Sequence, residues 1–321
     1  NQNVSIGSFN NSGTFTKAAG TTTSISSTFN NTGTVNVNGG PGNGLTLAAV
    51  TQHSGTTLTG GTWNVTNGST LTFSSGSNLT TIGSAASVTL DGTNSSFNRI
   101  PTTASTLTTN QGSFTLKNDR DLTTAGAFSN SGTVTVQDST TTMTIGAGGT
   151  ASYTQTAGNT VLVNGAMIDA SAFNLNGGTL SGNGTIDAPL TTSGSTIIGP
   201  GASPGALTIN GNTILGLGNT LSMEIGGLIP GIEHDLITVN GTMTLNGALL
   251  VKFFGGFETA LTMGSTFEIV TSNSPIQSSF SNVASGSQIW DFDHQHLFEV
   301  WYGATSIFDA NKVVLFALTP E

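Results

Sequence analysis

A short phrase recurs along this chain of 321 residues and constrains its fold more than any other feature. FNNSGTF starts at Phe9, FNNTGTV starts at Phe29, and FSNSGTV starts at Phe128. The first two copies are 20 residues apart, and the third follows after 99 residues, close to five further periods. A fixed period of roughly 20–50 residues is typical of solenoids, propellers and arrays, in which each repeat packs on its neighbours.

Alternation of apolar and polar residues fills the segments around these copies. VNV at 35–37, WNV at 63–65, VTL at 88–90 and VTV at 134–136 all have this pattern, which indicates half-buried β-strands. Gly, Asn, Ser and Thr separate the strands and favour tight turns, and no helical periodicity is visible. Short strands of this kind also fit a sandwich or a barrel, but the repeated phrase favours a solenoid.

We therefore predict an all-β chain with two regions. Residues 1–212 form a parallel β-helix, a solenoid with about 20 residues per coil. Residues 213–321 form a β-rich C-terminal region with longer strands, more charge and more aromatic residues. This region caps the solenoid or forms a small sandwich, because an open coil exposes apolar side chains and unpaired backbone groups.

The repeated phrase itself has a structural interpretation. The Phe residues fill the coil interior, and the Asn residues lie at a turn in left-handed geometry and stack into an amide ladder from coil to coil. The Gly residues supply positive φ or allow close approach of the backbone. The alternative is that the Asn ladder binds sugar. The residues concerned are Phe9, Asn10, Asn11, Gly13, Phe29, Asn30, Asn31, Gly33, Phe128, Asn130 and Gly132.

Composition excludes several classes of function. Only 7% of residues are charged, the net charge is −10, and the six Lys and Arg residues are dispersed. Such a chain cannot form the basic stripe that neutralises nucleic-acid phosphates or attracts anionic lipids. The absence of Cys excludes disulfides and thiolate metal sites. No apolar run reaches the ~18 residues of a membrane span, and no leader peptide is visible at Asn1, so we expect a processed product.

Two acidic stretches are candidate sites for metal or sugar. NDRD at 118–121 is the densest cluster in the first half, and we predict a solvated turn there, with a calcium or sugar site as the alternative. WDFDHQHLFEVWY at 290–302, if extended, would place acidic side chains on one face and imidazoles on the other. Its spacing matches no closed zinc site, so we predict no metal and no cofactor. The metal-ligand candidates there are Asp291, Asp293, His294 and His296.

Parallel β-helices often carry polysaccharide lyases and hydrolases, which need clustered carboxylates. The first 220 residues offer only scattered aspartates, so we predict that the chain is not an enzyme. A strongly apolar strand near the end of the chain is a candidate for donation to a neighbouring subunit. Its residues are Val313, Val314, Leu315, Phe316 and Leu318.

One long stretch carries a resemblance to known families. GTLSGNGTI, GPGASPGALTINGN, LSMEIGG and HDLITVNGTMTLNGALLVKFFGGF, spread over about 178–270, resemble the tail of bacterial autotransporter passenger domains and exported β-solenoid proteins with a PEP-CTERM sorting signal. Pro320 and Glu321 match the first two letters of that signal's Pro-Glu-Pro motif, while its second proline, apolar helix and basic tail are absent from the sequence. The resemblance implies an exported bacterial protein of the cell surface or matrix, often linked to biofilm or exopolysaccharide.

These observations lead to a functional hypothesis. The chain is a non-enzymatic extracellular structural protein, a filament or matrix subunit or adhesin, that assembles with itself head to tail through solenoid ends and strand donation. Exopolysaccharide is the second expected partner. The alternatives are a carbohydrate-binding or polysaccharide-degrading β-helix enzyme, and an autotransporter-like passenger adhesin.

Overall fold

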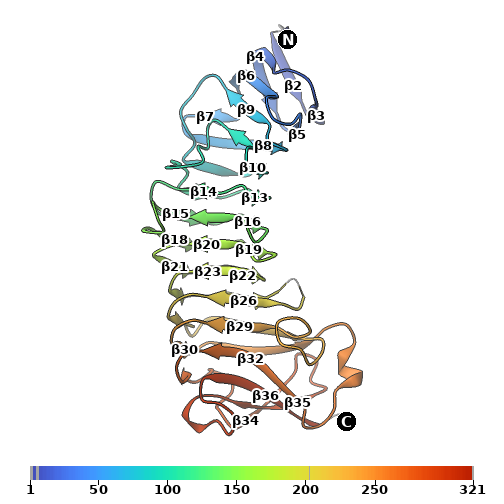
Figure 1. Cartoon of the computed structure of the whole chain (residues 1–321), viewed down its shortest axis with the longest axis vertical. Helices are drawn as coiled ribbons and strands as arrows, with labels where there is room; N and C mark the ends of the chain where they lie inside the picture. Colours follow the sequence, from blue (N-terminus) through green and yellow to red (C-terminus); the bar gives the residue numbers. More distant parts are fainter. Residues whose placement is uncertain (1–2, 5–6, 202, 320–321) are drawn as a thin grey trace. The chain divides into compact units, whose positions relative to one another are not determined.

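The computed structural model describes residues 3–4, 7–201 and 203–319 and shows a parallel β-helix (Figure 1). The described part contains no α-helix, and its helical turns are the 3-10 helices η1 (Phe257–Ala260) and η2 (Gly303–Thr305). The predicted all-β fold class is thus confirmed. The chain divides into a first unit, Asn1–Tyr153 with Ile168–Ala170, and a second unit, Thr154–Met167 with Ser171–Glu321.

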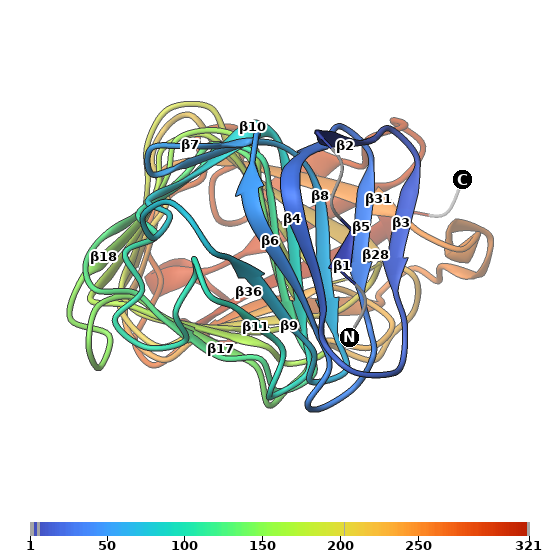
Figure 2. The same ribbon diagram turned by 90° about the horizontal axis from the view of Figure 1, so that it is seen from above.

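In the first unit, one parallel sheet collects a strand from each successive coil, so the coils lie over one another when seen from above (Figure 2). Its main strands are β3 (Thr14–Lys17), β5 (Thr34–Val37), β8 (Thr57–Thr66), β10 (Thr81–Asp91), β13 (Ser113–Lys117) and β16 (Thr133–Gln137). A second parallel sheet contains β1 (Asn3–Val4), β2 (Ser8–Asn11), β4 (Thr23–Asn31), β6 (Gly44–Val50), β9 (Thr70–Phe73) and β11 (Ser96–Phe97).

Short strands complete the first unit. They are β7 (His53–Ser54), which pairs antiparallel with β8, and β12 (Thr109–Asn110), β14 (Leu122–Thr123), β15 (Phe128–Asn130) and β17 (Thr142–Thr144). The division between the units falls within β18 (Ser152–Gln155) and β20 (Met167–Asp169).

The core of the first unit follows from the two-residue alternation of its strands. Val35, Trp63 and Val88 occupy equivalent registers in β5, β8 and β10 and are fully buried. Aromatic rings continue this interior, with centroid distances of 5.1 Å from Trp63 to Phe73 and 4.8 Å from Phe73 to Phe97. Burial of these large apolar side chains, at about 25 cal/mol per Å² removed from water, is the main force that holds the coils together.

Coil length varies more than the sequence predicts. Side-chain bonds between equivalent positions span 20 residues from Asn11 to Asn31 but 28 from Asn36 to Asn64. In the second unit the corresponding spans range from 17, for Ser193 with Asn176, to 33, for Asn282 with Leu249. Insertions lie at the turns and at two places where the strand register shifts, in β10 and β4. The 20-residue period also recurs outside the phrase, as between Asn159 and Thr179.

The second unit has three parallel sheets. The first consists of β19 (Asn159–Val163), β22 (Gly178–Gly182), β25 (Thr196–Pro200), β28 (Asn219–Ile225) and β31 (Ala248–Phe253). The second consists of β21 (Ala172–Leu175), β24 (Leu190–Thr192), β27 (Thr213–Ile214), β30 (Met243–Leu245) and β33 (Gln277–Ser278). The third contains β23 (Thr185–Asp187), β26 (Ala206–Ile209), β29 (Leu236–Val239) and β32 (Thr266–Ser272).

The expected boundary at 212/213 does not coincide with a change of topology. Parallel pairing continues beyond it through β29 with β32 and β30 with β33. The change comes at β32, which also pairs antiparallel with β36 (Lys312–Thr319). β35 (Leu297–Trp301) and β34 (Ser287–Trp290) follow, so the C-terminal region extends one solenoid sheet with antiparallel strands.

Candidate functional site

The repeated phrase places identical residues in register on adjacent coils. β2 pairs with β4 so that Phe9, Asn10 and Asn11 lie beside Phe29, Asn30 and Asn31. The two phenyl rings stack at 5.1 Å, Asn11 Nδ2 donates to Asn31 Oδ1 at 2.8 Å, and Asn30 Nδ2 donates to Asn10 Oδ1 at 3.0 Å. The predicted amide ladder is therefore confirmed.

Two details of the phrase differ from the prediction. The Asn residues lie at the ends of extended strands and do not adopt left-handed backbone geometry. Their side chains bridge the coils from this extended backbone. Phe29 and Phe128 are buried as expected, whereas Phe9 is half-buried. Gly33 and Gly132 allow close approach of the backbone, while Gly13 has no atom within 4 Å of a built Cβ.

Three further residues extend this ladder, and none of them belongs to the copies of the phrase found in the sequence. Asn110 Nδ2 donates to Asn130 Oδ1 at 2.9 Å, so TNQGSF at 109–114 is a further, degenerate copy of the phrase. Gln52 takes the place of an Asn and donates to Asn30 Oδ1 at 2.6 Å. Gln155 is fully buried and donates to three backbone carbonyls, including Gly158 O at 3.0 Å. In the sequence, each of these positions is an Asn or Gln that precedes a glycine by two or three residues, without the rest of the phrase.

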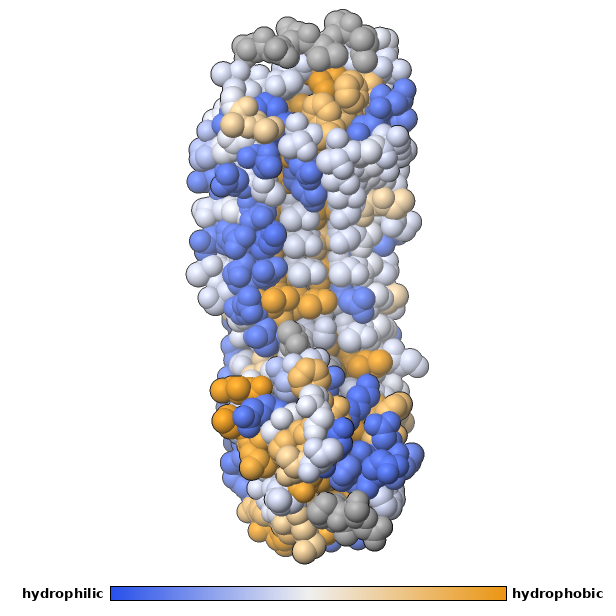
Figure 3. All heavy atoms as spheres, turned by 90° about the vertical axis from the view of Figure 1, so that its right-hand side faces the viewer, coloured by the Kyte–Doolittle hydropathy of each residue, from blue (hydrophilic) through white to orange (hydrophobic). Residues whose placement is uncertain are grey.

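A regular array of hydroxyl and amide side chains covers the outer face of the first unit's main sheet. The outward positions flank the central residue of each strand, which is buried in every strand except β3, where Phe15 is half-buried, and the register aligns them into two columns. The first column is Thr14, Thr34, Thr62, Ser87, Ser113 and Thr133, and the second is Thr16, Asn36, Asn64, Thr89, Thr115 and Thr135. We call these residues the polar array. Figure 3 faces this side, and its upper half shows stacked columns of pale side chains, the colour of Thr and Ser.

A polar groove borders the array. A cavity of about 490 Å³ is lined by Asn38, Thr66, Asn67, Asp91, Gly92 and Asn118. Lys117 Nζ lies 3.3 Å from Asp91 Oδ2, and Asn118 Nδ2 donates to Asp91 Oδ1 at 2.6 Å. The opposite charges of Lys117 and Asp91 cancel, so the array and its groove together present hydrogen-bonding groups without a net charge.

The NDRD stretch forms a turn, as predicted. Asn118 and Asp119 are exposed and have φ angles of 56° and 62°. Arg120 differs from the expected solvated side chain, because it is only 1% exposed and donates from Nε to Ser95 O at 2.6 Å. The arginine ties this turn to the preceding coil.

The four metal-ligand candidates do not converge. Residues 291–296 form the turn between β34 and β35, so the alternating faces expected of an extended strand do not exist. Asp291 is buried, accepts the Gln295 N–H at 2.8 Å and lies 3.4 Å from His296 Nδ1, which is the role of a turn-stabilising carboxylate. Asp293 and His294 are exposed. Within the described residues, no group of three or more His, Asp or Glu side chains could hold a metal ion.

The candidate assembly strand lies inside the chain's own sheet. β36 pairs with β32 on one edge and with β35 on the other. Val313, Val314 and Leu315 are buried, and Phe316 and Leu318 are half-buried. Donation to a neighbour would require both of these pairings to break, so the structure argues against β36 as a donor strand. The terminal Pro320 and Glu321, which carry the sorting-signal resemblance, lie outside the described residues.

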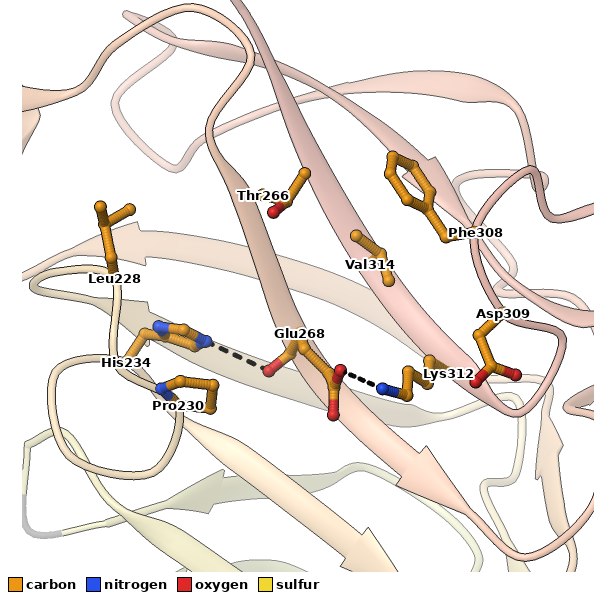
Figure 4. Close-up of a pocket in the computed structure, with 9 residues that line it drawn as sticks. All are labelled: Leu228, Pro230, His234, Thr266, Glu268, Phe308, Asp309, Lys312 and Val314. Carbon is orange, nitrogen blue, oxygen red and sulfur yellow. Dashed lines mark hydrogen bonds and ion pairs between the residues drawn. The ribbon is translucent and has the colours of Figure 1, made fainter.

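A pocket of about 490 Å³ opens in the second unit over β32 and β36 (Figure 4). Glu268 of β32 accepts from Lys312 Nζ at 2.6 Å across the floor. That bond raises the pKa of Lys312, so the ammonium stays charged. Phe308 and Asp309 lie on one side, and the loop 226–235 lies on the other.

Two buried titratable groups anchor that loop. The Asp235 carboxylate accepts the N–H groups of Gly205 at 2.9 Å and Glu224 at 2.8 Å, and burial raises its pKa to about 7. The His234 ring is fully buried, with Nδ1 3.0 Å from Gly227 O and Nε2 3.2 Å from Glu268 O. Burial lowers the pKa of His234, so its imidazole is neutral near pH 7.

Comparison with known proteins adds no assignment. No protein-family model matches this chain, and no curated protein matches it significantly. In the part of the chain that the structure describes, no helix is both long and apolar enough to cross a membrane.

Proposed function

We propose that this chain is an exported, non-enzymatic structural protein of a bacterial surface or matrix, an adhesin that binds uncharged polysaccharide. The observation that carries the proposal is the polar array, whose two columns run in register over six strands of the first unit. The array offers repeated binding groups to a repeating ligand, because adjacent parallel strands are about 4.8 Å apart.

The chemistry of the array fits sugar hydroxyls. A sugar hydroxyl both donates and accepts hydrogen bonds, and Thr, Ser and Asn side chains do the same. Asn64 and Asn36 are half-exposed, and a 2.9 Å bond from Asn64 Nδ2 to Asn36 Oδ1 leaves further donor and acceptor capacity on both amides. The net charge of −10 disfavours acidic polymers through long-range repulsion, which leaves neutral polysaccharides as the preferred class.

Co-sedimentation with insoluble neutral glucans and β-mannans tests this proposal. We expect saturable binding by the wild type, weakened at least about tenfold by the double variant T89V/T115V, which removes hydroxyls but keeps β-branched side chains. T144V is the matched control, because Thr144 is a half-exposed threonine of β17, outside the array. Equal binding by all three proteins, or binding to acidic polymers alone, would overturn the proposal.

Head-to-tail assembly through the solenoid ends stays a prediction. Phe9 and Phe15 are half-buried with ring centroids 5.5 Å apart, and each of their strands has one partner strand among the described residues. Strand donation by β36 does not fit this assembly, because both edges of β36 are already paired within the chain.

A further inference from the structure

The pocket over β32 and β36 has apolar walls and a charged floor. Leu228 and Pro230 come from the loop 226–235, and Phe308 lies opposite them (Figure 4). Leu228 is 55% exposed and Phe308 is 44% exposed, so both walls present apolar surface to solvent. The volume of about 490 Å³ falls within the range of about 300–1,000 Å³ found for small-molecule sites.

The charges of the floor do not balance. Glu268 and Asp309 are two carboxylates, whereas Lys312 is the one ammonium among the described lining residues, and the neutral His234 adds nothing. Glu268 Oε2 accepts from Lys312, and Asp309 Oδ1 accepts the Asn311 N–H at 2.9 Å. A carboxylate has about four lone-pair sites, so both groups retain capacity to accept further hydrogen bonds.

We propose that this pocket binds an aliphatic primary ammonium ion. The ammonium group donates to the Glu268 and Asp309 carboxylates, and the alkyl chain lies against Leu228, Val314 and Phe308. The ligand supplies the one positive charge that the floor lacks. This site belongs to the second unit and is independent of the polysaccharide proposal, which concerns the first.

Other ligand classes fit less well. An anion would have to displace Glu268 from Lys312 and meet Asp309, in a protein whose net charge is −10. A sugar carries no positive charge and would leave the net negative floor uncompensated. A neutral alcohol could contact the walls but would leave the negative floor uncompensated.

Isothermal titration calorimetry with three chemically matched probes tests the proposal: n-hexylamine, hexan-1-ol and hexanoate, each at pH 7 and low salt. We expect saturable binding of n-hexylamine in the low millimolar range and at least about tenfold weaker binding of the other two. Comparable or tighter binding of hexanoate, or no saturable binding of the amine, would overturn the proposal.

Two pairs of variants locate the site. D309N removes one floor carboxylate and should weaken n-hexylamine binding about tenfold, whereas D293N makes the same charge change at an exposed turn and should leave it unchanged. L228N should weaken binding of n-hexylamine but not of methylamine, because only the longer amine reaches the wall. L217N is its control, since Leu217 is 80% exposed and does not line the pocket. If D309N binds the amine as tightly as D293N does, the assignment is wrong.

Discussion

At the scale of single residues, the corner of the coil depends on an amide and a glycine that serve different purposes. The amide of Asn31 spans neighbouring coils, since it accepts from Asn11 and donates to Thr62 O at 3.3 Å. Gly33 lies where two backbones come closest, and a Cβ built there would overlap the carbonyl oxygen of Gly13. Neither Gly33 nor Gly13 has positive φ, so what Gly33 requires is space.

This contrast makes a matched pair of substitutions informative. We expect Gly33→Ala to lower the free energy of unfolding by about 2–3 kcal/mol, because the added methyl group forces the two coils apart. Gly13→Ala should change it by less than about 0.5 kcal/mol, because a Cβ there meets nothing within 4 Å. Urea unfolding followed by circular dichroism measures both. Equal destabilisation by the two variants would show that the coil corner requires the backbone freedom of glycine and not the close approach of two backbones.

At the scale of elements, the loop 226–235 depends on one buried carboxyl group. Asp235 joins two segments, because its oxygens accept from Gly205 before β26 and from Glu224 within β28. Burial disfavours the charged carboxylate, and the two N–H donors only partly oppose that effect, so the pKa rises from 3.8 to about 7.

The raised pKa predicts a pH-dependent stability with a definite sign. The folded state binds the Asp235 proton more tightly than the unfolded state, so this contribution is complete below about pH 4 and is lost as the pH rises through about 7. From pH 8 to pH 5, the wild type should gain up to about 3 kcal/mol of unfolding free energy relative to D235N.

Chemical denaturation at several pH values gives this difference. His234 acts in the opposite direction, since its lowered pKa gives a contribution that is present above about pH 6.5 and is lost as the pH falls. The comparison with D235N removes the His234 effect, because both proteins retain that residue. A wild-type advantage that stays constant from pH 8 to pH 5 would contradict the assignment to Asp235.

At the same scale, the sequence predicts strands better than it predicts turns. Triplets such as VTV at 134–136 identify the strands correctly, because the two-residue period directly records which side is buried. In the stretch 290–302 the extended geometry fails only at the turn 291–296, because the Asp291 side chain bonds the backbone of Gln295 and bends the chain, whereas 297–301 is a strand. The boundary at 212/213 does not appear in the strand pairing, because the rise in charged and aromatic residues after it leaves the parallel pairing unchanged, as β28 with β31 shows.

At the scale of the whole molecule, charged residues are few and unevenly distributed. Only 7% of the residues are charged, and the polar array contains none of them. The sequence shows that scarcity, but it could not show the array, because coils of 20 and 28 residues must first be brought into register. Nor could it show the pocket, whose walls come from segments about 80 residues apart in the chain. The two proposed sites thus differ in electrostatics, one neutral and the other with a net negative floor.

That difference predicts that salt weakens binding at the pocket and leaves binding at the polar array nearly unchanged. Raising NaCl from about 0.1 to about 1 M shortens the Debye length from roughly 10 to 3 Å, which screens partly exposed charges and leaves neutral hydrogen bonds nearly unaffected. Glu268 and Lys312 side chains are 29% and 35% exposed, so the pocket floor is open to screening. We therefore expect n-hexylamine binding to weaken several-fold over this range, while glucan co-sedimentation stays within about twofold. The salt response of D309N should be flatter than that of D293N, because one of the two screened carboxylates is gone. A parallel loss of both activities would mean that the polysaccharide is held by charge and that the neutral array is not its site.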